Sequence, residues 1–293
     1  MHGHARGGEG ECRNHHFDDA GYVPQRRACT KRISATHRTR SRKGSFVSSG
    51  RTLLITGVSR RIGAHLAAHY LARGDRVIGT YRQETAELAN LREQGLHAIR
   101  IDLTDTAALP GLIDDIAAYT DRLDAIVHNA SIWPSDNDCA SQPELITQLY
   151  QLHVTTPVQL TLALQHRLPA PSLDGRATRT VVFLTDTKVS AGSDGHLHYL
   201  SSKAAADSAM RSLAISLAPH TRVNAIAPGL ILFHEQDSTE KRANRLAKNL
   251  LPFEPGAEVI AESMDYLLDC SAVTGITLPV DCGLNLLNPS ARD

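Results

Sequence analysis

The chain has 293 residues, 42% hydrophobic and 21% charged, an ordinary composition for a globular protein that can bury a large core. Its 31 basic and 31 acidic residues balance, which argues against a whole-molecule attraction to nucleic acid or an anionic membrane. The five cysteines form no C-x-x-C pair, no apolar run is long enough to cross a membrane, and the N-terminus lacks a signal peptide's apolar core. We therefore expect a cytoplasmic protein with small-molecule partners, without disulfides or a bound metal.

Residues 1–50 form a basic tail with ten Lys or Arg against four Asp or Glu. The tail shows no apolar periodicity, which predicts disorder. It could bind nucleic acid, or grip a metal through His2, His4, His15 and His16. A solvated extension without a role is the favoured interpretation.

From Arg51 onward, short apolar runs alternate with longer amphipathic stretches. Strands with apolar side chains on both faces, joined by helices, are typical of a parallel sheet covered on both sides. The sequence therefore predicts one Rossmann-type α/β domain over residues 51–293, with a doubly wound seven-stranded parallel sheet and helices on both faces. Ligands should bind at the carboxyl ends of the strands. The predicted strands cover residues 52–56, 77–80, 98–101, 125–127, 181–184, 223–226 and 277–280.

The turn after the first predicted strand reads TGVSRRIG and contains Gly57 and Gly63. Glycines after a strand let the backbone approach a dinucleotide pyrophosphate, whose charge the next helix N-terminus binds. The spacing is not G-x-G-x-x-G, and glycines near a turn can also be simple turn chemistry. The loop by itself leaves both interpretations open.

The second predicted strand ends at Thr80-Tyr81-Arg82-Gln83, where a fold specific for NAD usually has an acidic residue for the ribose 2′-hydroxyl. An arginine there matches the charge and geometry of a 2′-phosphate, and Arg60 could join it. This favours NADPH over NADH as the cofactor. Considered alone, Arg82 could also be a solvated charge at a strand end.

Three later motifs complete a family pattern: HNAS at residues 128–131, the Y-x-x-x-K pair Tyr199 and Lys203, and Pro228-Gly229. In this order, and together with the first turn, they resemble the short-chain dehydrogenase/reductase family over residues 51–287. The resemblance implies that NADPH is bound by Gly57, Arg60, Arg61, Ile62, Gly63, Tyr81, Arg82, Asp102, Leu103, Asn129, Ser131, Tyr199, Lys203, Pro228 and Gly229. Asp102 is also a good cap for the turn that follows it.

Some positions depart from the commonest family pattern and look like pteridine reductases. Arg61 replaces the usual middle glycine, Asp186 replaces the usual serine thirteen residues before the tyrosine, and Trp133 is an aromatic where a pterin would stack on the nicotinamide. The resemblance therefore implies a 7,8-dihydropterin site made by Arg61, Ser131, Trp133, Asp186 and Tyr199. A carbonyl reductase for a sugar or 3-oxoacyl thioester, and a non-catalytic NADPH-binding regulator, are the alternatives.

Tyr199, Lys203 and Asp186 are the predicted catalytic residues. The first two lie four residues apart on a predicted helix and share one face. At an effective dielectric of about 20, an ammonium some 4 Å away stabilises a phenolate by roughly 4 kcal/mol before desolvation, so a lowered pKa is expected for Tyr199. Tyr199 would donate the proton to N5 while hydride reaches C6, and Asp186 suits the N–H-rich ring better than it suits a ketone.

Other features have more than one interpretation. His153 stands where many family members have a water-holding Asn, and is either a substitute for it or a packed helix residue. Cys282 replaces a common Gly, which suggests packing rather than redox chemistry. His196 and His198 are interpreted as loop histidines, and Trp133 could instead be ordinary packing. The resemblance also implies a tetramer formed through helices at 144–166 and 199–218.

Overall fold

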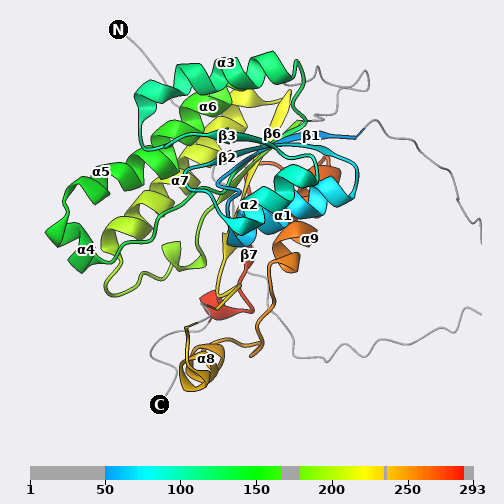
Figure 1. Cartoon of the computed structure of the whole chain (residues 1–293). Coiled ribbons are helices and arrows are strands. Elements are labelled where there is room, and N and C mark those ends of the chain that lie inside the picture. Colours follow the sequence, from blue (N-terminus) through cyan, green and yellow to red (C-terminus); the bar gives the residue numbers. More distant parts are fainter. Residues whose placement is uncertain (1–49, 166–178, 234–235, 287–293) are drawn as a thin grey trace, which may run out of the picture. The chain divides into compact units, whose positions relative to one another are not determined.

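The computed structural model describes residues 50–165, 179–233 and 236–286 (Figure 1). The prediction of a disordered tail falls almost entirely on residues 1–49, which lie outside these ranges. The division into a tail and one domain stays a prediction. None of the helices in the described ranges is long and apolar enough to cross a membrane.

Seven parallel strands form one sheet in the order β3-β2-β1-β4-β5-β6-β7, which confirms the predicted doubly wound Rossmann-type sheet. The order reverses between β1 and β4, and this switch point is where such sheets bind ligands. The strands are β1 Thr52–Thr56, β2 Arg76–Tyr81, β3 His97–Arg100, β4 Ala125–His128, β5 Arg179–Leu184, β6 Thr221–Pro228 and β7 Thr277–Val280. Several begin earlier than predicted because polar and charged residues open them, as Arg222 does in β6.

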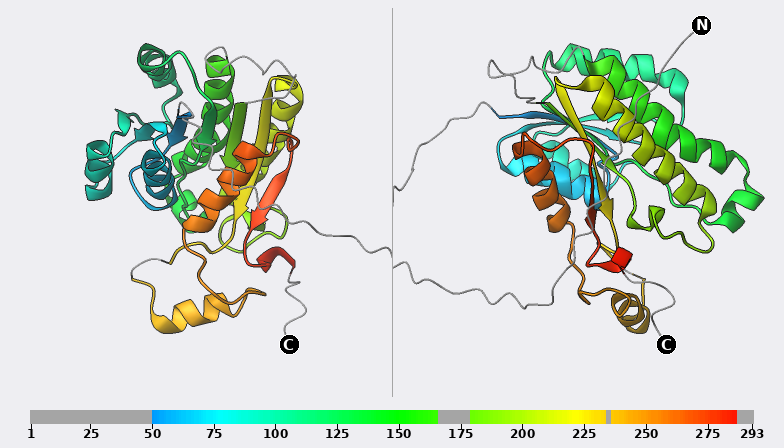
Figure 2. Two further views of the ribbon diagram at one scale, coloured as in Figure 1. Left: turned by 90° about the vertical axis from the view of Figure 1, so that its right-hand side faces the viewer. Right: turned by 180° about the vertical axis from the view of Figure 1, so that it is seen from behind.

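Helices cover both faces of the sheet, as the two views of Figure 2 show. On one face lie α1 Arg61–Ala72, α2 Ala86–Glu93 and α9 Glu258–Asp269. On the other lie α3 Leu109–Tyr119, α6 Thr156–Leu164 and α7 Leu197–Leu217. The remaining helices are η1 Thr106–Ala108, α4 Asp136–Ser141, α5 Glu144–Tyr150, η4 Thr187–Val189, α8 Thr239–Leu246 and η5 Leu284–Leu286.

The helix expected over residues 144–166 is interrupted by a π-helical turn, η2 Gln151–Thr155, between α5 and α6. Such a bulge adds a residue to the helix and is frequent at functional sites. The apolar pattern of the sequence does not reveal the bulge, because one extra residue shifts that pattern without ending it. The turn carries His153, whose side chain is buried.

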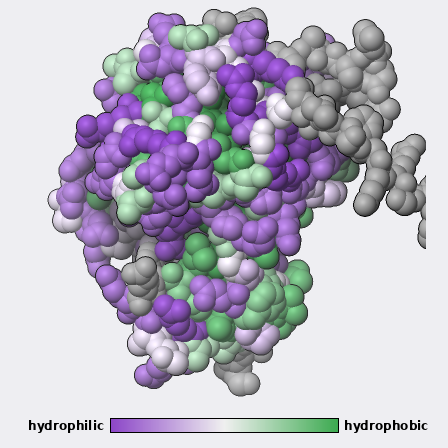
Figure 3. Space-filling view, turned by 45° about the vertical axis from the view of Figure 1, so that its right-hand side comes forward, coloured by the Kyte–Doolittle hydropathy of each residue, from purple (hydrophilic) through white to green (hydrophobic). Residues whose placement is uncertain are grey.

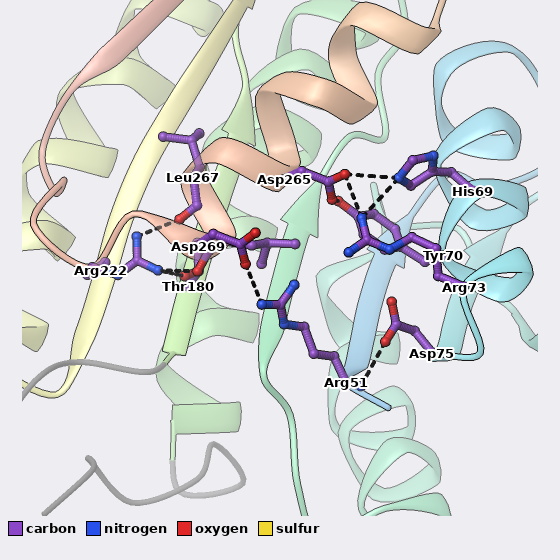
Figure 4. A network of polar contacts seen from close by, with 11 residues as sticks. Arg51, His69, Tyr70, Arg73, Asp75, Thr180, Arg222, Asp265, Leu267 and Asp269 are labelled. Carbon is purple, nitrogen blue, oxygen red and sulfur yellow. Dashed lines mark hydrogen bonds and ion pairs between the residues drawn. The ribbon is translucent and has the colours of Figure 1, made fainter. Parts of the chain in front are cut away.

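Buried polar contacts hold α9 to the sheet at the amino ends of the strands (Figure 4). The Arg222 guanidinium donates to the carbonyl oxygens of Leu267 and Leu268 at 2.5 and 2.9 Å, and to Thr180 Oγ1 at 2.6 Å. Arg222 thereby satisfies carbonyls in the last turn of α9 that lack helical partners. Nearby, Asp265 of α9 accepts from Arg73 of α1 at 2.5 Å.

The chain leaves the opposite, carboxyl end of the sheet after β6 and forms α8 there (Figure 1). Leu250, Leu251 and Phe253, in the segment after α8, are exposed. The space-filling view in Figure 3 shows apolar surface in this part of the molecule. Residues that follow β6 and β7 therefore lie beyond the carboxyl ends of the strands.

Candidate functional site

An open pocket of about 510 Å³ lies at the carboxyl ends of the strands. Every residue predicted to bind the cofactor or the substrate, and every predicted catalytic residue, lines it. These residues are Gly57, Arg60, Arg61, Ile62, Gly63, Tyr81, Arg82, Asp102, Leu103, Asn129, Ser131, Trp133, Asp186, Tyr199, Lys203, Pro228 and Gly229.

Close backbone packing explains the glycines of the first turn. Gly57 has φ +75, and a Cβ there would lie 2.9 Å from Ala130 Cα. A Cβ on Gly63 would lie 2.0 Å from the Gly57 oxygen. Asn129 Nδ2 donates to the Thr56 and Gly57 oxygens at 2.9 and 3.0 Å, so this amide braces the turn.

The N-terminus of α1 opens into the same pocket. Its N-cap residue, Arg60, makes no side-chain capping hydrogen bond, which leaves backbone N–H groups directed at the space where an anion would sit. Among the described residues, the non-glycine positions with positive φ are Arg61 and Cys282, both at φ 54, and the family pattern commonly has glycine at both. A side chain in this conformation costs roughly 1–2 kcal/mol. Arg61 Nη2 donates to the Leu232 oxygen at 3.2 Å, which ties the first turn to the segment after β6.

The end of β2 carries positive charge. Arg82 is half-exposed, with Nη1 3.9 Å from Asp102 Oδ2. Asp102 Oδ1 also accepts from the Thr104 backbone N–H at 3.0 Å and from its hydroxyl at 2.8 Å, so it caps the next turn as its position predicted.

Three titratable side chains meet at the inner end of the pocket. The Tyr199 hydroxyl donates to Asp186 Oδ2 at 3.2 Å. Lys203 Nζ donates to the Leu184 oxygen at 2.7 Å and lies 5.8 Å from the centroid of the Tyr199 ring. Because α7 carries Tyr199 and Lys203 one turn apart and Asp186 follows β5 directly, the fold places all three together.

The expected lowering of the Tyr199 pKa is wrong for this arrangement. Burial and, secondly, the Asp186 carboxylate raise the pKa of Tyr199 well above its usual value. The Lys203 ammonium, which was expected to lower that pKa, donates to a backbone carbonyl oxygen and not to the phenol. Burial lowers the pKa of Lys203 to about 8, with Asp186 acting in the opposite direction. Burial raises the pKa of Asp186. Strongly shifted groups around one pocket are typical of active sites.

The Trp133 side chain is 58% exposed, so ordinary core packing does not describe it. Its indole stacks on the His196 ring with centroids 4.4 Å apart and planes at 18°. His196 Nδ1 in turn lies 3.2 Å from the Pro134 oxygen. Sequence reasoning treated His196 as a loop residue, and no local pattern links it to an indole so distant in the chain.

His153 is 3% exposed, and both ring nitrogens have partners. Nδ1 lies 2.8 Å from Ser202 Oγ, and Nε2 lies 2.9 Å from Ser131 Oγ. The packed interpretation is therefore correct but incomplete, and Ser202 was not anticipated. No group of three or more His, Cys, Asp or Glu residues in the described ranges is arranged to hold a metal ion. The tail histidines lie outside those ranges.

Fold and site together define a short-chain dehydrogenase/reductase. A family model described as enoyl-(acyl carrier protein) reductase matches residues 57–285. The chain belongs to the short-chain dehydrogenase/reductase family, as its motifs predicted.

More specific similarity is to proteins named dihydromonapterin reductase. One from Escherichia coli is 38% identical over 234 residues, which are 80% of this chain and 96% of the relative. One from an Enterobacter species is 39% identical over 233 residues, with the same coverage. The crystal structure of FolM alternative dihydrofolate reductase 1 from Brucella canis, complexed with NADP, matches with TM-score 0.72 and 27% identity over 82% of this chain and 96% of that one. These relatives confirm the resemblance to pteridine reductases.

Proposed function

We propose that this chain is an NADPH-dependent reductase that converts a 7,8-dihydropterin, dihydromonapterin foremost, to its tetrahydro form, with dihydrofolate as a weak second substrate. The observation that carries the proposal is the contact between Tyr199 and the Asp186 carboxylate at the inner end of the pocket. A carboxylate accepts hydrogen bonds from an N–H-rich aminopyrimidine, whereas a ketone oxygen needs donors. The names of the relatives support the same substrate class.

The residues present fit NADPH. The cramped turn at Gly57 and Gly63 lets the backbone approach a pyrophosphate, and the N-terminus of α1 supplies donors for its charge. Arg60 and Arg82 suit a 2′-phosphate, because guanidinium groups bind phosphate in a bidentate geometry. When bound, this cofactor supplies the hydride that the substrate C=N bond accepts at C6.

The chain's own residues then manage the proton. Tyr199 stays protonated at neutral pH because burial and Asp186 raise its pKa, so it can donate to the pterin N5. Asp186 holds the ring N–H groups or returns a proton to the phenol. Trp133, stacked on His196, gives a flat wall against which the pterin ring can lie. Lys203 holds its ammonium beside the inner end of the pocket, where it orients the cofactor ribose.

The substrate class is tested by following NADPH absorbance with dihydromonapterin, dihydrobiopterin, dihydrofolate, and 3-oxoacyl and enoyl thioesters. We expect turnover of the pterins, and Tyr199→Phe should lower kcat by about 100-fold or more with little change in KM, since it removes only the proton donor. A circular dichroism spectrum and a thermal midpoint like those of wild type check that the variant is folded. Turnover of the thioesters alone would refute the pterin assignment, and no turnover of any substrate would favour a non-catalytic regulator.

Cofactor choice is tested at Arg82. Arg82→Asp should weaken NADPH binding by about 10- to 100-fold and leave NADH binding much less affected, because a charge-assisted pair with the 2′-phosphate is lost. Arg100→Asp is the matched control, since Arg100 ends β3, is exposed and does not line the pocket. Equal losses for both cofactors at Arg82 would contradict the assignment.

We further propose that the protein works in the cytoplasm and assembles as a tetramer through the helices α5, α6 and α7. Exposed apolar side chains on these helices support an interface there. They are Tyr150, Leu162, Leu197 and Ile215.

A further inference from the structure

The π-helical turn η2 places His153 between two serine hydroxyls. On one side lies Ser131, which follows β4 and lines the pocket. On the other lies Ser202, on α7 between Tyr199 and Lys203. The imidazole also meets the Tyr199 ring edge-on, with centroids 5.7 Å apart and planes at 85°. His153 therefore touches three neighbours of the reaction site without lining the pocket itself.

Counting protons decides which ring nitrogen of His153 carries the hydrogen. Burial, and secondarily Lys203, lower the pKa of His153 well below its usual value, so the imidazole is neutral with one N–H. Ser202 Oγ lies 2.7 Å from the Tyr199 carbonyl oxygen and 2.8 Å from His153 Nδ1, but it has one proton. An oxygen–oxygen contact of 2.7 Å without a proton is unfavourable, so the Ser202 proton lies toward Tyr199. His153 Nδ1 must then be the protonated nitrogen.

This tautomer sets the polarity of Ser131. With Nδ1 protonated, His153 Nε2 is a bare acceptor, and it lies 2.9 Å from Ser131 Oγ. The Ile132 oxygen competes for the Ser131 proton only at 3.2 Å. A buried Nε2 without a donor is costly, which favours the proton between Ser131 and the imidazole. The remaining lone pairs of Ser131 Oγ are then available to a donor group in the pocket, which Ser131 lines.

We infer that His153 is a positioning residue, whose Nδ1-protonated tautomer holds Ser131 as a hydrogen-bond acceptor and thereby selects substrates that present N–H groups. Asp186 and Ser131 then present acceptors to the pocket, and the single Tyr199 proton, which Asp186 accepts in this structure, is the one donated to the substrate. That polarity suits a heterocycle that carries N–H groups beside its C=N bond, and it leaves a carbonyl oxygen without a second donor besides Tyr199. The selection rests on the proposed function, whereas the tautomer does not.

The tautomer is measured directly by nitrogen-15 NMR of histidine-labelled full-length protein, without substrate. His153→Gln identifies the His153 signals among the 15 histidines. We expect at neutral pH a protonated Nδ1 and an unprotonated Nε2. A protonated Nε2, or a doubly protonated ring, would overturn the inference whatever the enzyme reduces.

Two amide variants separate the two contacts of His153. By covalent reach, Asn places its amide near the position of Nδ1 and Gln near that of Nε2. His153→Gln can therefore still accept from Ser131, whereas His153→Asn can only donate to Ser202. We expect His153→Gln to keep kcat for dihydromonapterin within about threefold, and His153→Asn and His153→Leu to lose about tenfold or more, the effect of one hydrogen bond of roughly 1.4 kcal/mol.

Ser131→Ala completes the test. In that background the Gln and Asn variants should have equal kcat, because the residue through which His153 acts is gone. Suppose instead that His153→Gln and His153→Asn have equal kcat in the wild-type background, and that kcat falls in proportion to the fall in the thermal unfolding midpoint. That result would show that His153 has only a structural role, and it would overturn the inference. A wild-type protein that reduces no pterin, but has the expected tautomer, would refute the proposed function and the selection while leaving the serine's polarity in place.

Discussion

At the scale of single residues, the site is governed by burial as much as by pairing. Lys203 is 4% exposed, and its ammonium has one carbonyl partner and a neighbouring carboxylate. Burying a charge is costly unless its partners compensate, and here they compensate only in part. The result is a lysine poised near neutral pH, next to a phenol that keeps its proton.

Lys203 makes stability depend on pH with a definite sign. Its pKa falls from 10.5 in the unfolded chain to about 8 in the fold, so between these values the folded state binds fewer protons. The free energy of unfolding contributed by this residue therefore rises from pH 8 towards pH 10, on the order of 3 kcal/mol over the full interval. Urea unfolding of the wild type and Lys203→Met at a series of pH values measures it. The difference between the two should grow with pH, and parallel curves would contradict the assignment.

At the scale of elements, short polar contacts decide how helices meet the sheet. The π-helical turn η2 places His153 inside, and the left-handed backbone of Arg61 starts α1. Arg222 in β6 binds the end of α9 (Figure 4). None of these features follows from the apolar pattern of the sequence.

Arg222→Leu should lower the free energy of unfolding by about 2–4 kcal/mol, because the last carbonyls of α9 and Thr180 Oγ1 lose buried, charge-assisted hydrogen bonds. KM and kcat should stay close to wild type, since the network lies at the amino ends of the strands, away from the pocket. Chemical denaturation and steady-state kinetics measure both. His65→Ala, which removes an exposed contact of α1 with Glu258 of α9, is the control and should cost less than about 1 kcal/mol. Equal costs would show that Arg222 does not stabilise α9.

At the scale of the whole molecule, the proposed tetramer rests on the exposed apolar side chains of α5, α6 and α7. Ile215 is 81% exposed on α7, a helix whose other face packs on the sheet. Single exposed apolar residues are common, but several on neighbouring helices favour an interface.

Light scattering on a sizing column tests the tetramer. We expect the wild type near four times the 31.8 kDa of one chain, and Ile215→Glu shifted to smaller species, because a carboxylate would be desolvated in the interface. A circular dichroism spectrum like that of wild type shows that the variant is folded. A monomeric wild type at micromolar concentration would refute the assembly.

Local sequence was sufficient for the sheet and for the Tyr199 and Lys203 pair, because each depends on residues a few positions apart. Apolar runs show strand placement, and four-residue spacing on a helix aligns two side chains. The site residues implied by the family resemblance line one pocket because the parallel sheet brings the carboxyl ends of its strands together. Several predicted strands begin too late because polar or charged residues, such as Arg222, open the observed strands.

Tertiary structure alone decided where protons and charges face. The sequence places Lys203 near Tyr199, but it does not show that the ammonium contacts the Leu184 oxygen. Nor does it show that burial and the Asp186 carboxylate raise the pKa of the phenol. Contacts of His153 with Ser131 and Ser202 span 22 and 49 positions. A hydrogen bond depends on tenths of an ångström and on the partners available, and residue spacing along a chain contains neither.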